Sequence, residues 1–418
     1  MYNAKIWLNG VLIGHRPNGY IGFSVDLSEH LNYGGENLIA VQLTPEDLSS
    51  RWYPGAGIYR NTWLEINNPV HVAKWGTFIT TPTITDELAN INIQTEIENT
   101  TSTNKTITIQ TQIFSKENQE LSTVSETLSV KKNEISIVNQ STEIVNPKLW
   151  GLQSPYLYRA ETKLFEKGNL IDTYNTTFGV RTIKYGSDFG FKLNDKPTKF
   201  QGVCLHHDLG PLGTAVNKRA TERQLEIMQD MGVNAIRTSH NPPSPEQVEL
   251  CDQMGLMIQI EAFDMWEKPK VENGYSKFFN QWHQQDLRDM IRAFRNSPSV
   301  VMWSIGKEIL EQSDKINGKR IADELALICK QEDPTRPTTA GFNYYPAPIK
   351  NGLAEAIDLV GWNYKPRKYQ EISEQHQDWI SYGSETSSTV SSRGVYHLTS
   401  TKYKIHESLQ ITQYDLIG

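Results

Sequence analysis

The chain has 418 residues and a formal net charge of −7, from 41 Lys and Arg against 48 Asp and Glu. This length suits two to four domains, and the acidic balance argues against nucleic acid as a partner. The longest apolar runs, such as Ser299 to Ile305, are far too short to span a membrane. We therefore expect neither nucleic acid nor a membrane among the partners of this protein.

Three cysteines, Cys204, Cys251 and Cys329, lie far apart in the second half of the chain. Their spacing fits neither a disulfide framework nor a cluster of metal ligands. Because each lies beside apolar residues, we predict three buried free thiols. No other ligand cluster stands out, so the sequence predicts neither a metal site nor a cofactor.

The chain divides into three zones with different residue patterns, which predict three domains. Residues 1–69 are strand-like, with Gly, Asn and Pro turns and a dense aromatic segment from Arg51 to Arg60. Residues 70–183 alternate apolar and polar side chains, as in Ile91 to Ile97, with turns roughly every ten residues, which is typical of an antiparallel sandwich. Over residues 184–418 strand-like and helix-like segments alternate, which indicates parallel strands joined by helices.

In the third zone the sequence indicates where helices begin and end. Thr221 to Gln224 matches a capping box, as does Ser244 to Gln247 with Pro245 at the first helical position. Gly232 and Gly255 follow these two helices as predicted C-terminal stops. Apolar residues at helical spacing predict two further helices, at Leu287, Met290, Ile291 and Phe294 and at Ile321, Leu325 and Ile328.

Short apolar runs between these helices predict seven parallel strands. No Gly-rich phosphate loop follows the first run, which favours a (β/α)₈ barrel over a dinucleotide-binding sheet. A complete barrel needs eight strands and about 250 residues, so we expect the chain to stop one βα unit short of a barrel. Because Met1 leads straight into a strand-like run, we also expect the start of the first domain to be missing. The runs are Phe200–Leu205, Asn234–Thr238, Leu256–Ile260, Val300–Ile305, Thr338–Phe342, Leu359–Trp362 and Trp379–Tyr382.

Polar, ionisable and aromatic residues follow most of these runs. In a barrel such residues gather at the rim formed by the carboxyl ends of the strands, where active sites lie. This convergence favours a functional site over a random set of loops. The residues are His206, His207, Asp208, His240, Asn241, Glu261, Asp264, Trp266, Lys307, Glu308, Asn363, Tyr364 and Glu385.

Two glutamates, Glu308 and Glu385, directly close the fourth and the seventh run. Ionised side chains are rarely buried unless they are paired. Glycoside hydrolysis requires at least two carboxyl groups that face each other across the scissile bond. The alternative for each glutamate alone is that it begins a surface loop after a core strand.

Four segments carry a resemblance to a known family: Arg237 to Pro243 (RTSHNPP), Glu261 to Asp264 (EAFD), Trp303 to Glu308 (WSIGKE) and Gly383 to Thr386 (GSET). In this order they resemble glycoside hydrolase family 2, and most of all its β-galactosidases. The Arg51 to Arg60 segment is similar to the end of the sugar-binding jelly-roll domain of that family.

The resemblance implies a multidomain chain that combines β and α/β domains. It consists of a partial jelly-roll β-sandwich over residues 1–69, an immunoglobulin-like β-sandwich over 70–183 and an incomplete (β/α)₈ TIM barrel over 184–418. It also implies that Glu308 is the general acid/base and Glu385 the nucleophile of a retaining hydrolase that cleaves terminal β-D-galactosides through a covalent glycosyl-enzyme. The carboxyl groups of such a pair lie about 5–5.5 Å apart, and we predict that spacing here.

Supporting roles in substrate binding follow from the same resemblance. His240 is similar to the sugar-contacting histidine of the family, and Tyr364 to the tyrosine whose hydroxyl orients the nucleophile. Trp266 is a candidate for stacking on a pyranose face, with core packing as the alternative. His206 and Asp208 are candidates for binding sugar hydroxyls, with a loop-capping role as the alternative.

Three further features of the rim have mainly structural interpretations. We expect Glu261 to pair within the rim rather than to react, and His207 to be structural. The aromatic residues between Arg51 and Arg60 are expected to pack at a domain interface, with a sugar contact as the alternative.

Lys307 departs from the family pattern, which has Asn immediately before the acid/base to bond the 2-hydroxyl of the sugar. An amide both donates and accepts, whereas an ammonium only donates and adds a full charge. A cation beside Glu308 favours the ionised carboxylate, the wrong form for a general acid. We therefore expect Lys307 to slow turnover.

Several alternatives remain open at this stage. β-Glucuronidases and β-mannosidases share the expected architecture, and Asn363-Tyr364-Lys365 superficially matches the N-x-K pair of β-glucuronidases. A catalytically impaired carbohydrate-binding homologue is a second alternative, because of Lys307 and the expected truncation. No N-terminal signal pattern is present, so localisation stays open. The resemblance is compatible with a periplasmic or extracellular location and with a homo-oligomer.

Overall fold

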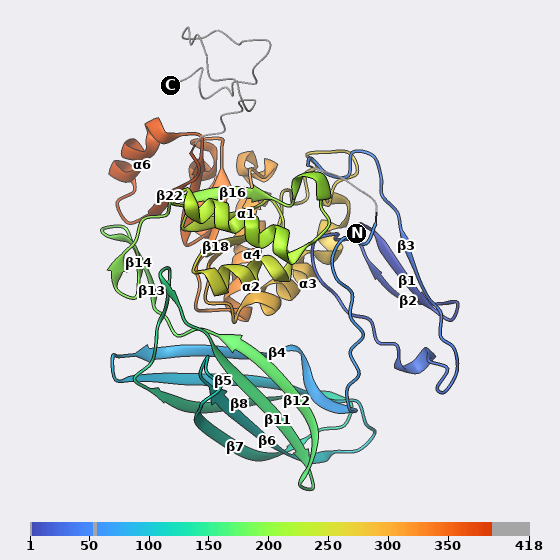
Figure 1. Ribbon diagram of the computed structural model, residues 1–418. Coiled ribbons are helices and arrows are strands. Elements are labelled where there is room, and N and C mark those ends of the chain that lie inside the picture. The colour runs from blue at the N-terminus through green and yellow to red at the C-terminus, as the bar shows by residue number, and fades with distance from the viewer. Residues whose placement is uncertain (1, 53–56, 387–418) are drawn as a thin grey trace.

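The structure is a computed structural model that describes residues 2–52 and 57–386. Three parts follow one another along the chain (Figure 1). An antiparallel N-terminal sheet lies beside an α/β barrel, and a two-sheet β-sandwich lies below that barrel in the view. The expectation of a multidomain β plus α/β fold is thereby confirmed.

The N-terminal sheet has the order β2-β1-β3 and is small. Ala4, Ile6 and Leu8 alternate on the buried face of its central strand, as a half-buried strand requires. The chain then continues past a short 3₁₀ turn, η1, toward the barrel rim. The strands are β1 (Ala4–Leu8), β2 (Val11–Arg16) and β3 (Ile39–Leu43), and η1 spans Ser28–His30.

The sandwich consists of two antiparallel sheets with the strand orders β4-β5-β8 and β12-β11-β6-β7. Isoleucines at every second position, such as Ile91 and Ile93 on one sheet and Ile107 and Ile109 on the other, are fully buried between the sheets. Its strands are β4 (Val70–Ile84), β5 (Leu88–Asn99), β6 (Lys105–Phe114), β7 (Glu120–Val130), β8 (Glu134–Val145), β11 (Tyr158–Glu166) and β12 (Asn169–Phe178). Short connecting strands are β9 (Trp150–Gly151), β10 (Ser154–Pro155), β13 (Ile183–Gly186), β14 (Gly190–Leu193) and β15 (Lys196–Pro197).

Seven parallel strands in sequence order form the barrel sheet of the described residues, and the sheet curls into an incomplete barrel. The seven predicted runs all coincide with these strands. They are β16 (Gly202–His206), β17 (Ala235–Ser239), β18 (Met257–Glu261), β19 (Val300–Lys307), β20 (Thr338–Phe342), β21 (Leu359–Asn363) and β22 (Ile380–Glu385).

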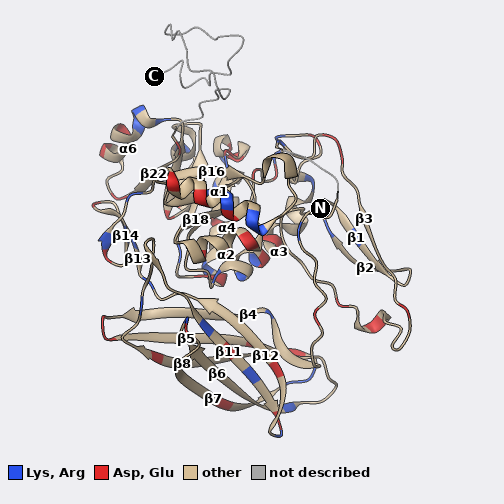
Figure 2. Ribbon diagram, in the orientation of Figure 1, with Lys and Arg blue, Asp and Glu red and all other residues tan. Residues whose placement is uncertain are grey.

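Helices cover the outside of this sheet and bury their apolar faces against it (Figure 1). Lys and Arg residues are interspersed with Asp and Glu residues along these helices (Figure 2). Among the described residues no helix is long and apolar enough to cross a membrane. The helices are α1 (Lys218–Asp230), α2 (Pro245–Met254), α3 (Ser276–Phe294), α4 (Asn317–Glu332), α5 (Ala347–Lys350) and α6 (Tyr369–Gln375). The 3₁₀ turns are η2 (Gly210–Leu212), η3 (Leu310–Ser313), η4 (Ala354–Ala356) and η5 (Pro366–Lys368).

Helix α2 begins as predicted: the Ser244 hydroxyl accepts from the Gln247 N–H, and Pro245 follows it. Helix α1 begins earlier than predicted. Its cap is Asn217, whose side chain accepts from the Ala220 N–H, and Thr221 lies inside the helix, where its hydroxyl bonds the Asn217 carbonyl. Both residue types cap helices well, and the capping-box pattern at Thr221 selected the wrong one.

Gly255 ends α2 in the left-handed conformation with φ +77°. A Cβ at this position would lie 2.3 Å from the carbonyl oxygen of Leu152, in the turn between β9 and β10. Only glycine fits both constraints. The end of α2 and the turn between β9 and β10 can therefore pack in contact.

Two polar contacts fix the N-terminal part on the barrel. The Arg16 guanidinium pairs with Asp289 at 2.7 Å on α3, and Arg60 donates to the Pro242 carbonyl at 2.8 Å. Residues 18–20 and 48–52 line a cavity together with residues of the barrel rim. Cys204 is exposed, unlike the buried Cys251 and Cys329. The prediction of three buried thiols is wrong at Cys204, which lies on β16 at one edge of the described sheet.

Candidate active site

Glu308 directly follows β19, and its backbone has φ +45°, a conformation that side-chain-bearing residues rarely adopt. The Glu308 N–H donates to the Gly341 carbonyl at 2.7 Å at the end of β20. Tyr364, directly after β21, also has a positive φ of 59°, and its N–H donates to the Glu385 carbonyl at 2.6 Å. Backbone strain of this kind clusters at functional sites, and here it turns two side chains inward at the rim.

The Glu308 carboxylate is held by one neutral and one charged donor. Asn363 Nδ2 donates to its Oε1 at 2.9 Å, and Lys307 Nζ donates to its Oε2 at 2.8 Å. The expected contact between a cation and this carboxylate is therefore present. The side chains of Lys307 and Glu308 are only 4% and 11% exposed, so water weakens this ion pair little.

The Glu385 carboxylate accepts from stronger donors. Arg237 Nη1 donates to its Oε1 at 2.6 Å, and the Tyr364 hydroxyl donates to its Oε2. His240 Nε2 lies 3.6 Å from Oε1, too far for a hydrogen bond. Burial favours the neutral acid, but Arg237, Lys307, His240 and Tyr364 together outweigh burial and lower the pKa of Glu385 to about 2. Glu385 is therefore an anion at neutral pH.

A second buried carboxylate, Glu261, organises the floor of the site. It accepts from Arg237 Nη2 and from the Ser304 hydroxyl, each at 2.7 Å, and its Oε1 lies 2.6 Å from His240 Nδ1. Glu261 thus pairs within the rim, as the sequence indicated. Burial, reinforced by Arg237 and Lys307, lowers the pKa of His240 well below its usual range. A neutral His240 donates through Nδ1 to Glu261, which leaves Nε2 free to accept from a sugar hydroxyl.

Asn363 and Tyr364 together orient both glutamates. Asn363 donates to Glu308, and its own Oδ1 accepts from the Ser384 hydroxyl at 2.6 Å, while Tyr364 donates to Glu385. Asn363 is fully buried. The sequence pointed to Tyr364 but missed the roles of Asn363 and Arg237. Only their positions in the predicted strands could have indicated these roles: Asn363 ends β21, and Arg237 lies within β17.

Trp52 brings an aromatic ring from the N-terminal part into the site. Its ring centroid lies 4.7 Å from that of His240 and 5.2 Å from that of His206, and Lys307 Nζ lies 5.4 Å from the Trp52 ring centroid. The sequence left open whether the Arg51–Arg60 segment contacts a sugar. Trp52 lies close enough to His240 and Lys307 to make such a contact. Residues 53–56 of that segment lie outside the described part of the chain.

The remaining predicted binding residues differ in position. His206 is half-buried beside Trp52 and His240, and burial lowers its pKa. The Asp208 carboxylate accepts from the Gly210 N–H at 3.0 Å, the loop-capping role. Trp266 is fully buried, and its indole N–H donates to the Ile305 carbonyl at 2.8 Å. Stacking of Trp266 on a sugar is therefore wrong, because core side chains cover the ring.

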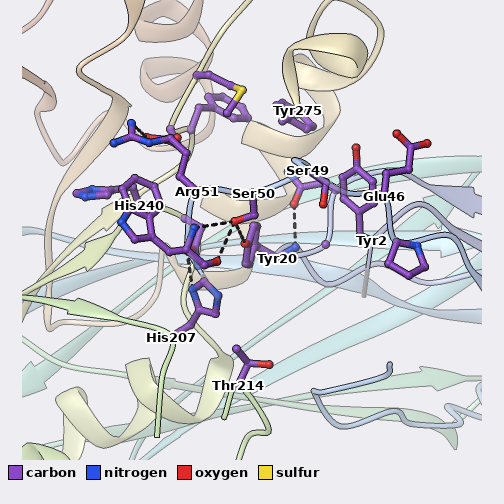
Figure 3. Close-up of a pocket in the computed structure, with 18 of the residues that line it drawn as sticks. Tyr2, Tyr20, Glu46, Ser49, Ser50, Arg51, His207, Thr214, His240 and Tyr275 are labelled. Carbon is purple, nitrogen blue, oxygen red and sulfur yellow. Dashed lines mark hydrogen bonds and ion pairs between the residues drawn. The ribbon is translucent and has the colours of Figure 1, made fainter. Parts of the chain in front are cut away.

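A cavity of about 380 Å³ opens between the N-terminal segment and the barrel rim (Figure 3). Tyr20, Ser50 and Arg51 line it on one side, and His207 and His240 on the other. It meets the carboxylate site at His240, while Glu308 and Glu385 lie outside its lining. In the described part of the chain, no group of three or more His, Cys, Asp or Glu is placed to hold a metal ion.

Two regions of the chain match one family. Residues 70–181 match the family described as "Glycosyl hydrolases family 2", and residues 186–392 match "Glycosyl hydrolases family 2, TIM barrel domain". Together these regions cover more than half of the chain. The chain therefore belongs to glycosyl hydrolase family 2.

Individual relatives agree with this assignment. A curated beta-galactosidase from Bacteroides ovatus, BoGH2A, is 37% identical over 96% of this chain and 51% of its own length. A crystal structure of a family 2 member from Bacteroides cellulosilyticus superposes with a TM-score of 0.89 at 37% identity, over 92% of this chain and 49% of that one. A Bacteroides uniformis beta-glucuronidase superposes with a TM-score of 0.80 at 27% identity, over 91% and 49%. The chain thus spans about half the length of the relatives it matches.

Replacement of Arg237 by Met is expected to destabilise the protein by about 3–5 kcal/mol, because two buried carboxylates lose their shared counter-ion. The measurement is urea denaturation followed by tryptophan fluorescence. Arg219→Met is the matched control, since Arg219 also pairs with two glutamates but its side chain is 63% exposed. That control should cost less than about 1 kcal/mol. Equal effects of the two substitutions would contradict the network.

The low pKa of Glu385 predicts a specific pH dependence of stability. The folded state keeps Glu385 ionised down to about pH 2, whereas an ordinary Glu titrates near 4.5. Its contribution to stability is therefore fully present above about pH 5 and is lost as the pH falls toward 2. The difference in unfolding free energy between the wild type and Glu385→Gln should shrink over this window. A difference that stays constant from pH 6 down to about pH 2.5 would show that the pKa is not depressed.

Proposed function

We propose that this protein is a retaining O-glycoside hydrolase that cleaves terminal β-D-galactosides, with Glu385 as the nucleophile and Glu308 as the general acid/base. The observation that carries the proposal is the contrast between the two carboxylates. Glu385 is kept anionic by Arg237 and Tyr364. Glu308, by contrast, directly follows β19 and is held by an amide and an ammonium.

This contrast suits the two steps of retaining hydrolysis. In the first step the Glu385 carboxylate attacks the anomeric carbon while Glu308 gives its proton to the leaving oxygen. In the second step Glu308 removes a proton from water, which attacks the same carbon and releases Glu385. Retention requires carboxyl groups about 5 Å apart, and that separation remains our prediction for this pair.

The residues around the pair have roles that follow from their contacts. Tyr364 and Arg237 orient the nucleophile and compensate its charge. His240 has Nε2 available as an acceptor for a sugar hydroxyl, and Trp52 offers an aromatic wall beside it. Aromatic faces suit the apolar C–H surface of a pyranose ring. The substrate is therefore expected to enter between Trp52 and the two glutamates.

The galactoside is favoured over the glucuronide by two observations. The relative from Bacteroides ovatus with 37% identity is named a beta-galactosidase. In addition, Asn363 donates its amide to Glu308 and is fully buried, so it is not available to form a carboxylate-binding N-x-K pair with Lys365. The beta-glucuronidase from Bacteroides uniformis, at 27% identity, is what keeps the glucuronide as the second candidate.

The proposed roles predict different rescue by azide. Glu385→Ala should lose at least about 10³-fold in kcat on p-nitrophenyl β-D-galactoside, and added azide should restore activity with formation of the α-galactosyl azide. Glu308→Ala should lose about 10²–10⁴-fold on substrates with poor leaving groups, and azide should give the β-galactosyl azide. Product anomers are read by proton NMR.

The same assay with p-nitrophenyl β-D-glucuronide and β-D-mannoside ranks the three sugars. A higher kcat/KM on either of these than on the galactoside would replace the galactoside in the proposal. Glu311→Gln serves as the control, because Glu311 is fully buried and follows β19 closely but bonds the Lys268 N–H away from the pair. The absence of azide rescue in both alanine variants would contradict the proposed mechanism itself.

A further inference from the structure

One peptide group fixes the backbone of the proposed acid/base. It joins Lys307 to Glu308, and both of its polar atoms are bonded to other segments. The Lys307 carbonyl accepts from Lys270 Nζ at 2.6 Å, and the Glu308 N–H donates to the Gly341 carbonyl at 2.7 Å. These two bonds set the plane of the peptide group, and the φ of +45° at Glu308 is measured from that plane. Because a strained backbone persists only where its surroundings hold it, the conformation of Glu308 depends on Lys270 as well as on β20.

Lys270 is a buried ammonium in the loop between β18 and α3, and its side chain is only 7% exposed. Its Nζ lies 3.0 Å from Asp264 Oδ1 in the same loop. Burial lowers the pKa of Lys270 to about 8, an effect that Asp264 opposes and Lys307 increases. A buried cation needs a counter-ion close by, so Asp264 keeps Lys270 charged and in place at neutral pH.

Asp264 also reaches the N-terminal part of the chain. Its Oδ1 lies 3.4 Å from Arg51 Nη1, and both residues line the cavity beside the barrel rim (Figure 3). The central carbon of the Arg51 guanidinium lies 4.3 Å from the centroid of the Trp52 ring, a cation–π contact. Trp52 is the aromatic wall of the proposed substrate site. One oxygen of Asp264 therefore serves two cations, Lys270 toward the acid/base and Arg51 toward the aromatic wall.

This arrangement depends on the negative charge of Asp264. Arg51 and Lys307 each disfavour the charged form of Lys270, whereas Asp264 favours it. Because like charges repel, removal of the anion drives Lys270 and Arg51 apart. Asparagine keeps the size of the side chain but not its charge, so Asp264→Asn removes the interaction with little change in packing.

We propose that Asp264 and Lys270 are positioning residues of the hydrolysis, which hold the proposed acid/base and the aromatic wall in one geometry. This inference rests on the proposed role of Glu308. Lys270 fixes the peptide group before Glu308, so it governs proton transfer to the leaving oxygen. Arg51 fixes the ring of Trp52, so it governs substrate binding. Asp264 controls both, because it is the anion that the two cations share.

The test uses two galactosides that differ in their need for an acid. Phenyl β-D-galactoside has a poor leaving group, whereas the leaving group of 2,4-dinitrophenyl β-D-galactoside departs without protonation. Lys270→Met should lower kcat/KM at least about tenfold on the phenyl galactoside, a part of the 10²–10⁴-fold that general acid catalysis supplies, and less than about twofold on the dinitrophenyl galactoside. Arg51→Gln should instead raise KM by about threefold on both, the equivalent of one lost cation–π contact.

Asp264→Asn should show both effects. Adding Lys270→Met to it should not increase the loss on the phenyl galactoside, because the two residues act through one contact. Each ratio of the two kcat/KM values comes from a single protein sample, so it does not depend on the folded fraction. Lys268→Met is the control: Lys268 lies in the same loop but pairs with Asp314 at 2.7 Å, and its ratio should equal that of the wild type.

Equal losses on the two galactosides in Lys270→Met, or an unchanged ratio in Asp264→Asn, would overturn the inference. A wild type that hydrolyses neither galactoside rejects the proposed function instead, and a crystal structure of Asp264→Asn then decides the inference. In that structure the Lys270 ammonium should leave the Lys307 carbonyl, and the Trp52 ring should move from its place beside His240. An unchanged position of either group would overturn the inference without any measurement of turnover.

Discussion

The guanidinium of Arg237 is the constraint on which the site depends. One nitrogen donates to Glu261 and the other to Glu385, and all three side chains are nearly or fully buried. Two carboxylates on β18 and β22 cannot stay ionised in a barrel interior without such a cation. Because Arg237 lies within β17, its guanidinium is fixed by the sheet itself. The position and ionisation of Glu385 are therefore properties of the barrel and not of a loop.

Glu308, on the opposite side of the site, is held in a different way. Glu308 lies just beyond the end of β19 in a left-handed backbone conformation, and its carboxylate meets one amide from β21 and the ammonium of Lys307. Asn363 and Tyr364 are neighbours in sequence, so the backbone turn after β21 sets both glutamates at once. A single short turn thus couples the geometry of the two carboxylates, and Lys307 pairs with Glu308 while it also helps to keep Glu385 ionised.

The sequence predicted the strands well because each strand is a short apolar run between helices whose ends the sequence marks. Such a pattern is local in the chain. The sequence predicted Ser244 as a cap and missed Asn217, because Thr221 presents an equally good local pattern. The sequence could not distinguish the two interpretations of Trp266, because a large aromatic side chain suits both sugar stacking and core packing. In the structure Trp266 is fully buried, so it packs in the core. The contacts of Arg237 and Asn363 were missed for a different reason: their partners lie 24 to 148 and 21 to 55 residues away in the chain. Trp52 reaches the site from the N-terminal part of the chain, and the sequence could only leave a sugar contact of its segment open as an alternative.

The central claim is that Glu385 is the nucleophile of a retaining hydrolase. The most direct measurement is to incubate the protein with a 2-deoxy-2-fluoro-β-galactoside that has an activated leaving group, and to map the covalent adduct by mass spectrometry of its peptides. Retaining hydrolysis predicts one fluorogalactosyl group, attached to the peptide that contains Glu385 and absent from the Glu385→Gln variant. An adduct on Glu308, or on any residue other than Glu385, would contradict the account.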